Sequence, residues 1–309
     1  MKAAKVAEKP RPHSAPAAAP GAPPAVPLTL DGSSVLHQMF RVRWSAWEKL
    51  SGGERDEIAG QAADVLTEME GHSEGGSAVF SQLGHKGDLI LVHFRRSFDA
   101  LNDTELRLAK LALSDYLEPT TSYVSVVELG LYEASVQLYQ ALEEKGLQPG
   151  SPEWLAAEKD QMAEQAQAMA PRLWPRVPPH RYLCFYPMDK KRGEVNNWYN
   201  VPIGERRRMM RDHGLIGRRY AGKVKQIISG SIGFDDWEWG VDLFANDPLV
   251  FKKLIYEMRF DEASALYALF GPFYIALRFP AKQLRAFLDG KRPAYDPPPE
   301  EEGSQGTPK

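Results

Sequence analysis

The sequence predicts an α+β protein built from two consecutive units of the order βαββαβ. Strand and helix patterns alternate in the same order over residues 35–129 and again over residues 182–278. Each unit contains two short strands joined by a glycine-containing connector, a pattern typical of a hairpin. This element order is that of a ferredoxin-like fold. Two such units in tandem would form a pseudo-symmetric pair of sheets with helices packed on one side.

The first unit opens with a strand predicted from Val35 to Trp44, where apolar residues alternate imperfectly with His and Arg. A helix follows it, with Ser51 as the candidate N-cap. The remaining elements of the unit are two strands near 78–83 and 88–94, a helix from Asp103 or Thr104 through Leu113, and a strand over 121–129. An extra helix over Ser151 to Ala170 bridges the two units, and Pro152 suits its first turn.

The second unit begins with a strand at Tyr182–Met188. Pro187 is expected to end its ladder, because proline has no N–H to donate. The further elements are helical segments between Ile203 and Tyr220, strands over 224–229 and 237–244, a helix from Asp247-Pro248 through Arg259, and a strand over 271–278.

These patterns divide the chain into four segments. Residues 31–171 hold the first unit and the bridging helix, and residues 172–292 hold the second unit. Residues 1–30 are rich in Ala and Pro, and residues 293–309 are polar. Neither segment has the apolar content of a packed core, so both are predicted to be disordered tails. The first also lacks the apolar stretch of a secretory signal.

Composition excludes several classes of function. The formal net charge of −3 over 309 residues gives no overall field that would favour nucleic acid or an anionic membrane. Cys184 is the single cysteine, so no intrachain disulfide and no cysteine-based zinc or iron–sulfur site can form. No apolar run approaches the roughly 20 residues of a membrane span. A reducing compartment, the cytoplasm, is therefore expected.

The most informative segment is Cys184 to Tyr199. Tyr186 lies in a short apolar strand, and Lys190 follows four residues later, ahead of two further cations. An oxidisable phenol beside cations suits oxidation chemistry on an anionic substrate. The ordinary alternative is an amphipathic strand followed by a solvated basic turn, and residue types alone favour that alternative.

Three other features each leave two interpretations open. His213, followed by glycine, is either a residue that caps a helix C-terminus or a single imidazole ligand of an iron macrocycle. Gln226, expected to point inward on an apolar strand, is either a satisfied core amide or a hydrogen-bond donor into a cavity. Trp198, Trp237 and Trp239 either line a flat ligand or fill the core.

Residues 186–199, 209–244 and 251–275 together resemble coproheme decarboxylases of the chlorite dismutase-like superfamily. The resemblance extends over about Leu36 to Arg278 and is most specific from Arg172 onward. It implies that the two ferredoxin-like halves form an α+β barrel, with the haem in the C-terminal half. It also implies a homopentamer.

The resemblance assigns roles to individual residues. His213 matches the histidine that binds iron, Tyr186 the catalytic tyrosine, and Lys190 a lysine near the reactive propionate. Gln226 matches a distal glutamine, where chlorite-degrading members have an arginine. The remaining cofactor-binding positions are the propionate-binding Arg172 and the pocket residues Met188, Trp198, Trp237 and Ser264.

The implied activity is the oxidative decarboxylation of Fe-coproporphyrin III (coproheme) to haem b, with hydrogen peroxide as the oxidant. A monovinyl, monopropionate porphyrin is the intermediate, and a Tyr186 radical would take a hydrogen atom from the propionate. Contact with a coproporphyrin ferrochelatase would follow from such a role. The alternatives are a chlorite-degrading or peroxidase-like haem enzyme, and a non-enzymatic haem carrier or sensor.

Overall fold

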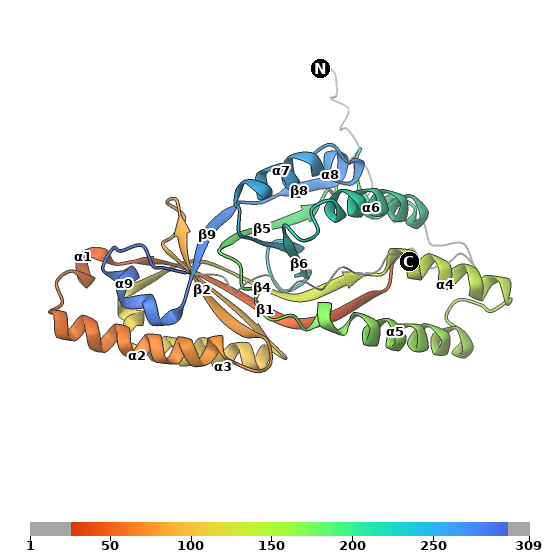
Figure 1. Cartoon of the computed structure of the whole chain (residues 1–309). Coiled ribbons are helices and arrows are strands. Elements are labelled where there is room, and N and C mark those ends of the chain that lie inside the picture. Colours follow the sequence, from red (N-terminus) through yellow and green to blue (C-terminus); the bar gives the residue numbers. More distant parts are fainter. Residues whose placement is uncertain (1–25, 296–309) are drawn as a thin grey trace, which may run out of the picture.

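The chain folds into a ring of antiparallel strands with helices on its outside (Figure 1). A computed structural model describes residues 26–295. The strands are β1 (Thr29–Val42), β2 (Gly76–Leu83), β3 (Leu89–Arg95), β4 (Leu117–Gly130), β5 (Tyr182–Lys190), β6 (Lys225–Gly230), β7 (Trp239–Ala245), β8 (Ala268–Phe270) and β9 (Tyr274–Phe279).

Strand order shows two copies of one arrangement. The first half has the order β4-β1-β3-β2, and the second has the equivalent order β9-β5-β7-β6. In both, the four strands of the unit lie in the order fourth, first, third, second. The halves join where β2 pairs with β9 and where β4 pairs with β6. The prediction of an α+β fold from two tandem ferredoxin-like halves is therefore confirmed.

The helices cover the outer faces of the two halves separately. In Figure 1, α2 and α3 lie along the first half, while α6, α7 and α8 lie along the second. The helices are α1 (Trp44–Trp47), α2 (Gly52–Glu70), α3 (Phe98–Ala109), α4 (Tyr132–Glu144), α5 (Pro152–Leu173), α6 (Ile203–Arg218), α7 (Leu249–Met258), α8 (Glu262–Tyr267) and α9 (Leu284–Leu288). Short 3₁₀ turns lie at Ala112–Tyr116 (η1), Trp198–Asn200 (η2) and Ala281–Gln283 (η3). Within residues 26–295, no helix is long and apolar enough to cross a bilayer.

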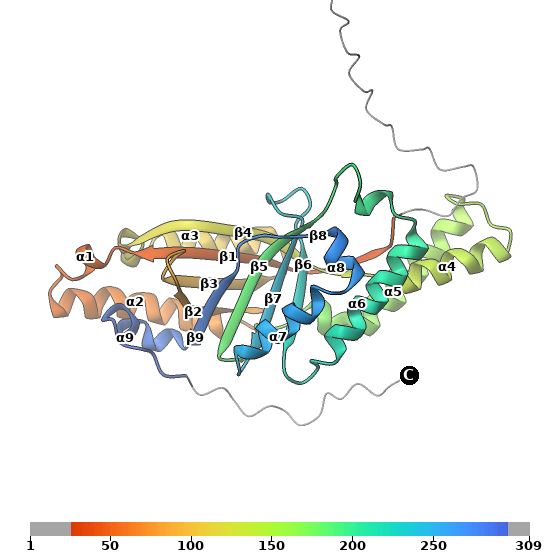
Figure 2. The ribbon, with the colours of Figure 1, turned by 90° about the horizontal axis from the view of Figure 1, so that it is seen from above.

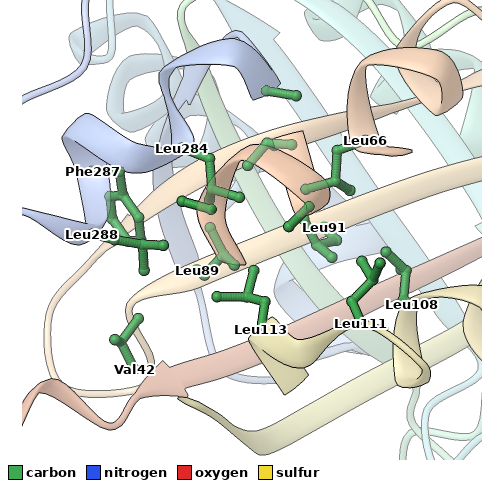
Figure 3. Close-up of a cluster of buried hydrophobic side chains, with 14 of the residues drawn as sticks. Val42, Leu66, Leu89, Leu91, Leu108, Leu111, Leu113, Leu284, Phe287 and Leu288 are labelled. Carbon is green, nitrogen blue, oxygen red and sulfur yellow. The ribbon is translucent and has the colours of Figure 1, made fainter. Parts of the chain in front are cut away.

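Helix α2 and the C-terminal helix α9 close one hydrophobic core over the first half. Leu66 of α2, Leu89 and Leu91 of β3, and Leu284 and Phe287 from the chain's end lie together in it (Figure 3). Residues 66–91 belong to the first half, whereas Leu284 and Phe287 follow the second half, so the C-terminal segment completes the core of the N-terminal half.

A second core fills the inside of the ring. It combines Val35 and Phe94 from the first half with Phe185 and Phe244 from the second. Figure 2 shows the strands of the two halves crossing at a steep angle around it. Because side chains alternate along a strand, the other face of β5 is left for the helices of the second half.

Several boundaries of the first unit differ from the prediction, most clearly those of β1 and α3. Strand β1 begins at Thr29, inside the predicted tail, because its pairing with β4 continues to Gly130. It ends at Val42, before α1. Helix α3 begins at Phe98 rather than at Asp103 or Thr104, because the Ser97 side chain caps it by accepting the Ala100 N–H. The rest of the predicted tails, residues 1–25 and 296–309, lies outside the described residues.

Helix α4 was not predicted from the sequence. Its buried face, Val136, Tyr139 and Leu142, has helical spacing. Tyr139 stacks on Trp154 of α5 at a centroid distance of 5.7 Å. The helices α4 and α5 therefore form a pair at the end of the molecule, with α5 matching the predicted bridging helix.

Pro187 does not end β5, so that prediction was wrong. It lies opposite Gly240 in the ladder with β7, and its carbonyl still accepts the Gly271 N–H at 2.9 Å. The strand continues to Lys190 by pairing with β8. A proline removes one donor, and a change of partner strand at that point lets the ladder continue.

Candidate functional site

The helix-facing side of β5 carries Cys184, Tyr186, Met188 and Lys190 at alternate positions. This side packs under α6 and α7, in a cluster that includes Val241 of β7. Because β5 continues past Pro187 by pairing with β8, the alternation of side chains puts Tyr186 and Lys190 on one face. The helices above that face bring in the other candidate residues.

Tyr186 is buried among aromatic rings. Its ring centroid lies 4.6 Å from that of Phe273 and 5.8 Å from that of Phe270. The Arg259 guanidinium stacks 4.0 Å from the Phe270 centroid. Burial raises the pKa of Tyr186, and the charge of Arg259 opposes this only in part. The phenol is therefore neutral and protonated, with a cation close by.

Lys190 is a partly buried cation at the end of β5. Its Nζ donates to the Ala263 carbonyl at 3.3 Å and lies 4.4 Å from the centroid of the Trp198 ring. Burial lowers its pKa to about 8, and the charge of Asp261 opposes that change. The ammonium group thus has few polar partners and can pair with an anion.

His213 lies within α6, which continues to Arg218, so the prediction that it ends a helix was wrong. Its Nδ1 lies 2.9 Å from Asp261 Oδ2, and Ser264 Oγ lies 3.4 Å from the same nitrogen. Burial disfavours the ionised Asp261, but the hydrogen bond and charge of His213 together with the hydrogen bonds from Ser264 outweigh it, and the pKa of Asp261 is lowered. An ionised carboxylate needs a donor, so Nδ1 carries the proton and the Nε2 lone pair is left for a ligand.

This His–Asp pair would suit a histidine that binds iron. Metal-binding histidines usually donate their second ring nitrogen to a carboxylate, which orients the ring and strengthens the donor nitrogen. Asp261 is itself fixed, because its carboxylate accepts the backbone N–H and the hydroxyl of Ser264 at 2.9 and 3.0 Å. The orientation of the His213 ring is therefore fixed by a carboxylate that is itself held by two hydrogen bonds.

Gln226 lies on the helix-facing side of β6, not inward as predicted. It pairs in register with Leu243, which belongs to the cluster under α6 and α7. Its side chain is exposed. The Gln226 Oε1 lies close to Gly217 of α6, 4.0 Å from the position that a Cβ at this glycine would take. Met188 packs against the same cluster. Both residues thus share the face of the sheet that holds Tyr186.

The two predicted pocket tryptophans lie in different places. Trp198, 2% exposed, packs with Met209 of α6 and with Ala263, next to Lys190. Trp237 precedes β7 and packs against the core inside the ring, and its carbonyl accepts the Tyr123 hydroxyl at 3.2 Å. The strand predicted over 237–244 begins only at Trp239, so Trp237 lies outside it.

Arg172 is exposed in the last turn of α5. Its Nη1 lies 3.8 Å from Met169 Sδ on the same helix. The described contacts bring together Lys190, Trp198, His213 and Ser264, with Tyr186 on the same strand face. They do not bring Arg172 or Trp237 to this group, so a substrate-binding role for those two stays a prediction.

Two residues of the site, Asp261 and Arg259, were not predicted from the sequence. Asp261 had a local signal, because an aspartate three residues before Ser264 is a typical N-cap of a short helix. Arg259 had none, because its proximity to Tyr186 depends on how α7 packs on the sheet.

A family model for chlorite dismutases matches residues 55–279, most of the chain. The chain belongs to the chlorite dismutase family. A structure of a heme-binding protein from Thermus thermophilus is 40% identical, with a TM-score of 0.72, and covers 86% of this chain and 98% of that one. A chlorite dismutase of Candidatus Nitrospira defluvii shares the fold at 15% identity, with a TM-score of 0.63, covering 84% and 96% of the two chains.

A curated family member from Haloquadratum walsbyi is 43% identical over 269 residues and is named as a candidate heme-binding protein. The match covers 86% of this chain but only 48% of that protein. The chain thus spans about half the length of this relative. Members of the chlorite dismutase family include haem-dependent enzymes, and the two relatives at 40% identity or more are named for heme binding.

Proposed function

We propose that the protein converts coproheme to haem b by peroxide-dependent oxidative decarboxylation, through a monovinyl, monopropionate intermediate. The observation that supports this most is Tyr186, a buried phenol with the charge of Arg259 near it and Lys190 four residues further along the same face of β5. It lies on the side of the sheet over which α6 carries His213.

The described residues fit this substrate. Coproheme has four propionates, and a site for it needs cations at several points. Lys190 and Arg259 supply two, and Arg172 is a proposed third. His213, supported by Asp261, would hold the iron, while the partly exposed Phe270 and Met188 offer apolar surface for the flat ring and Trp198 packs beside Lys190.

The reaction balances with one peroxide for each propionate. The side chain –CH₂–CH₂–COO⁻ becomes –CH=CH₂ with release of CO₂, one proton and two electrons. Hydrogen peroxide takes up two electrons and two protons to give two waters. The bound iron supplies the oxidising chemistry with peroxide. Each turnover therefore consumes one net proton.

The protein's own groups perform the remaining work. Tyr186, once it has lost its hydroxyl hydrogen, takes a hydrogen atom from the propionate β-carbon. Loss of CO₂ and of a second electron then leaves the vinyl group. Lys190 holds the reacting carboxylate, and with a pKa of about 8 it can also deliver a proton near neutral pH. Gln226, a neutral amide, takes the distal position of the arginine in chlorite-degrading members.

Three broader properties belong to the same proposal. A cytoplasmic location, assembly as a homopentamer and transient contact with a coproporphyrin ferrochelatase would suit a late step of haem biosynthesis. Support comes from the family membership and from the heme-binding names of the two relatives.

The test is to load the purified protein with iron-coproporphyrin III, add peroxide in steps and separate the porphyrins by chromatography. We expect the monovinyl porphyrin first and haem b second, with about two peroxides consumed per haem. Unchanged coproheme in loaded protein would contradict the proposal and favour a carrier. Oxygen release from chlorite by the haem-loaded protein, without decarboxylation, would favour the chlorite-degrading alternative.

A further inference from the structure

The loop that follows β5, residues 191–200, folds back on itself, so that its last residues pair with its first ones. Arg192 forms a bridge with Asn197, and the Trp198 N–H donates to the Lys191 carbonyl at 2.9 Å. This path places the Trp198 ring 4.4 Å from Lys190 Nζ. The position of the Lys190 ammonium therefore depends on how this loop is held.

Glu238 holds the loop from the neighbouring strand. Its Oε2 accepts the Lys190 backbone N–H at 3.2 Å and the Tyr199 hydroxyl at 2.7 Å. Its Oε1 lies 3.6 Å from Arg192 Nη1. One carboxylate thus contacts Lys190 and Arg192 at the start of this segment and Tyr199 at its end.

Glu238 is itself fixed in place just before β7. Its N–H donates to Asp189 Oδ1 at 2.8 Å, and its carbonyl accepts the Ser231 N–H at 2.7 Å. The residue is only 8% exposed. A buried carboxylate costs free energy unless it is paired, and here each of its pairs belongs to the same loop.

We infer that Glu238 is the positioning residue for Lys190 and Trp198, and that its carboxylate holds the loop closed over the Lys190 side chain. This inference rests on the proposed function, in which Lys190 meets the reacting carboxylate. Glu238 does not touch the substrate in this arrangement. It acts through the loop, by keeping the ammonium group buried against Trp198 and aimed at the site.

Three variants test the inference. Glu238→Gln keeps the size of the side chain but removes its charge and turns one acceptor into a donor. Tyr199→Phe removes only the hydroxyl on the loop side of the same contact. Glu257→Gln is the matched control, because Glu257 accepts the Tyr220 hydroxyl at 2.6 Å and pairs with Arg219 at 2.9 Å, away from this loop.

The first measurement needs no substrate. In Glu238→Gln, hydrogen exchange should accelerate at the backbone amides of residues 190–199 and stay unchanged in α2. The pH-independent rate at which a small amine-reactive reagent acylates the neutral Lys190 amine, as read by mass spectrometry over a range of pH, should also increase. Tyr199→Phe should change both in the same direction by less, and the control should change neither. Unchanged exchange and labelling in Glu238→Gln would overturn the inference.

The pH dependence of the labelling separates positioning from a direct charge effect. Burial lowers the pKa of Lys190 to about 8, and the charged group that acts on the ammonium is Asp261 at the start of α8, while Glu238 just before β7 contacts the Lys190 backbone N–H. Removing a nearby negative charge would lower the pKa further. Opening the loop exposes the ammonium group and raises the pKa, and we expect the rise. A fall would show that Glu238 acts only as a charge.

The kinetic measurement compares the variants with wild type under the porphyrin assay. We expect kcat for vinyl formation to fall about 10-fold or more in Glu238→Gln, because small displacements of a reacting group are costly. Coproheme affinity should change less. If wild type itself forms no vinyl product, the proposed function fails while the exchange and labelling results still judge the role of Glu238.

Discussion

Tyr186 and Lys190 lie on one face of β5, and burial favours the neutral form of both. For Tyr186 this means that the phenol stays protonated, since its pKa is raised. For Lys190 it means that the pKa is lowered to about 8, so the proton is held more loosely than on a surface lysine. One physical effect, burial, thus keeps the Tyr186 phenol protonated and makes the Lys190 ammonium a stronger acid on the same face of the strand.

Replacing Tyr186 with Phe should abolish decarboxylation and leave the fold and coproheme binding in place. The ring contacts with Phe270 and Phe273 remain, so stability should change little. A lost hydrogen bond to a propionate would weaken binding by at most about 1.5–3 kcal/mol. The measurement is the Soret band of the loaded variant, followed by chromatography after peroxide. Tyr256→Phe, on the exposed side of α7, is the control that should stay active.

Replacing Lys190 with Met should stabilise the protein at neutral pH while reducing activity. The folded pKa of about 8 lies below the ordinary 10.5, so burying the charged form costs stability at every pH below 8. That cost disappears as the pH rises from about 8 to 10.5. Denaturant unfolding should therefore show a gain of roughly 1–3 kcal/mol at pH 7 that shrinks towards pH 10. A variant that is less stable than wild type at pH 7 would contradict this.

At the scale of single elements, α2 shows how a short signal in the sequence fixes a helix start. The Ser51 hydroxyl accepts the Glu54 N–H, and the Glu54 carboxylate accepts the Ser51 N–H at 2.8 Å. This reciprocal pair satisfies two backbone donors that the first turn would otherwise leave free. Helix α2 is important beyond its own length, because it carries the core that α9 completes.

Ser51→Ala should lower the free energy of unfolding by about 1 kcal/mol, the usual cost of a lost N-cap. Thermal unfolding followed by circular dichroism would show it, while coproheme binding should be unchanged because the site lies on the other half. Ser51→Asp keeps a capping acceptor and should recover most of the loss. Equal destabilisation by both substitutions would mean that the cap is not the cause.

Helix α8 has a capping residue with two roles. Asp261 accepts the Ser264 N–H as the N-cap and also accepts the His213 Nδ1–H. The helix start and the candidate iron ligand are therefore fixed by one carboxylate. Its lowered pKa means that this support is present above the ordinary carboxyl range and is lost as the pH falls through the lower folded value.

At the scale of the whole molecule, a buried pair ties the two halves together inside the ring. His37 Nε2 of β1 lies 2.8 Å from Asp242 Oδ1 of β7, and both side chains are nearly inaccessible. The His37 ring also stacks on Phe185 at a centroid distance of 4.0 Å. The strand that presents Tyr186 on its outer face is thus held from within by a residue of the other half.

Asp242→Ala should destabilise the whole protein rather than one half. It leaves a buried ring nitrogen of His37 without its partner, which costs about 1–3 kcal/mol. Both halves share the inner core, so we expect a single unfolding transition at lower denaturant concentration. The exposed Asp236→Ala is the control and should change stability little. Two separate transitions in Asp242→Ala would show that the pair is what couples the halves.

The sequence by itself determined the features that depend on neighbours along the chain. The tandem βαββαβ order follows from residue periodicity and the cap at Ser51 from residue type, and both signals are local. The likeness of residues 186–275 to a known family led to His213 as the candidate ligand. The boundaries of β1 and α3 were less accurate, because strand pairing and a cap at Ser97 set them.

Only the tertiary structure decided which distant residues meet. Asp261 lies behind His213 from 48 positions away, and Glu238 reaches the Lys190 N–H across the same separation of 48. Continuation of β5 past Pro187 needed β8 as a new partner. The protonation of Tyr186 and Lys190 depends on burial, and burial exists only once the helices have packed on the sheet. These are properties of contacts between segments, and no local pattern contains them.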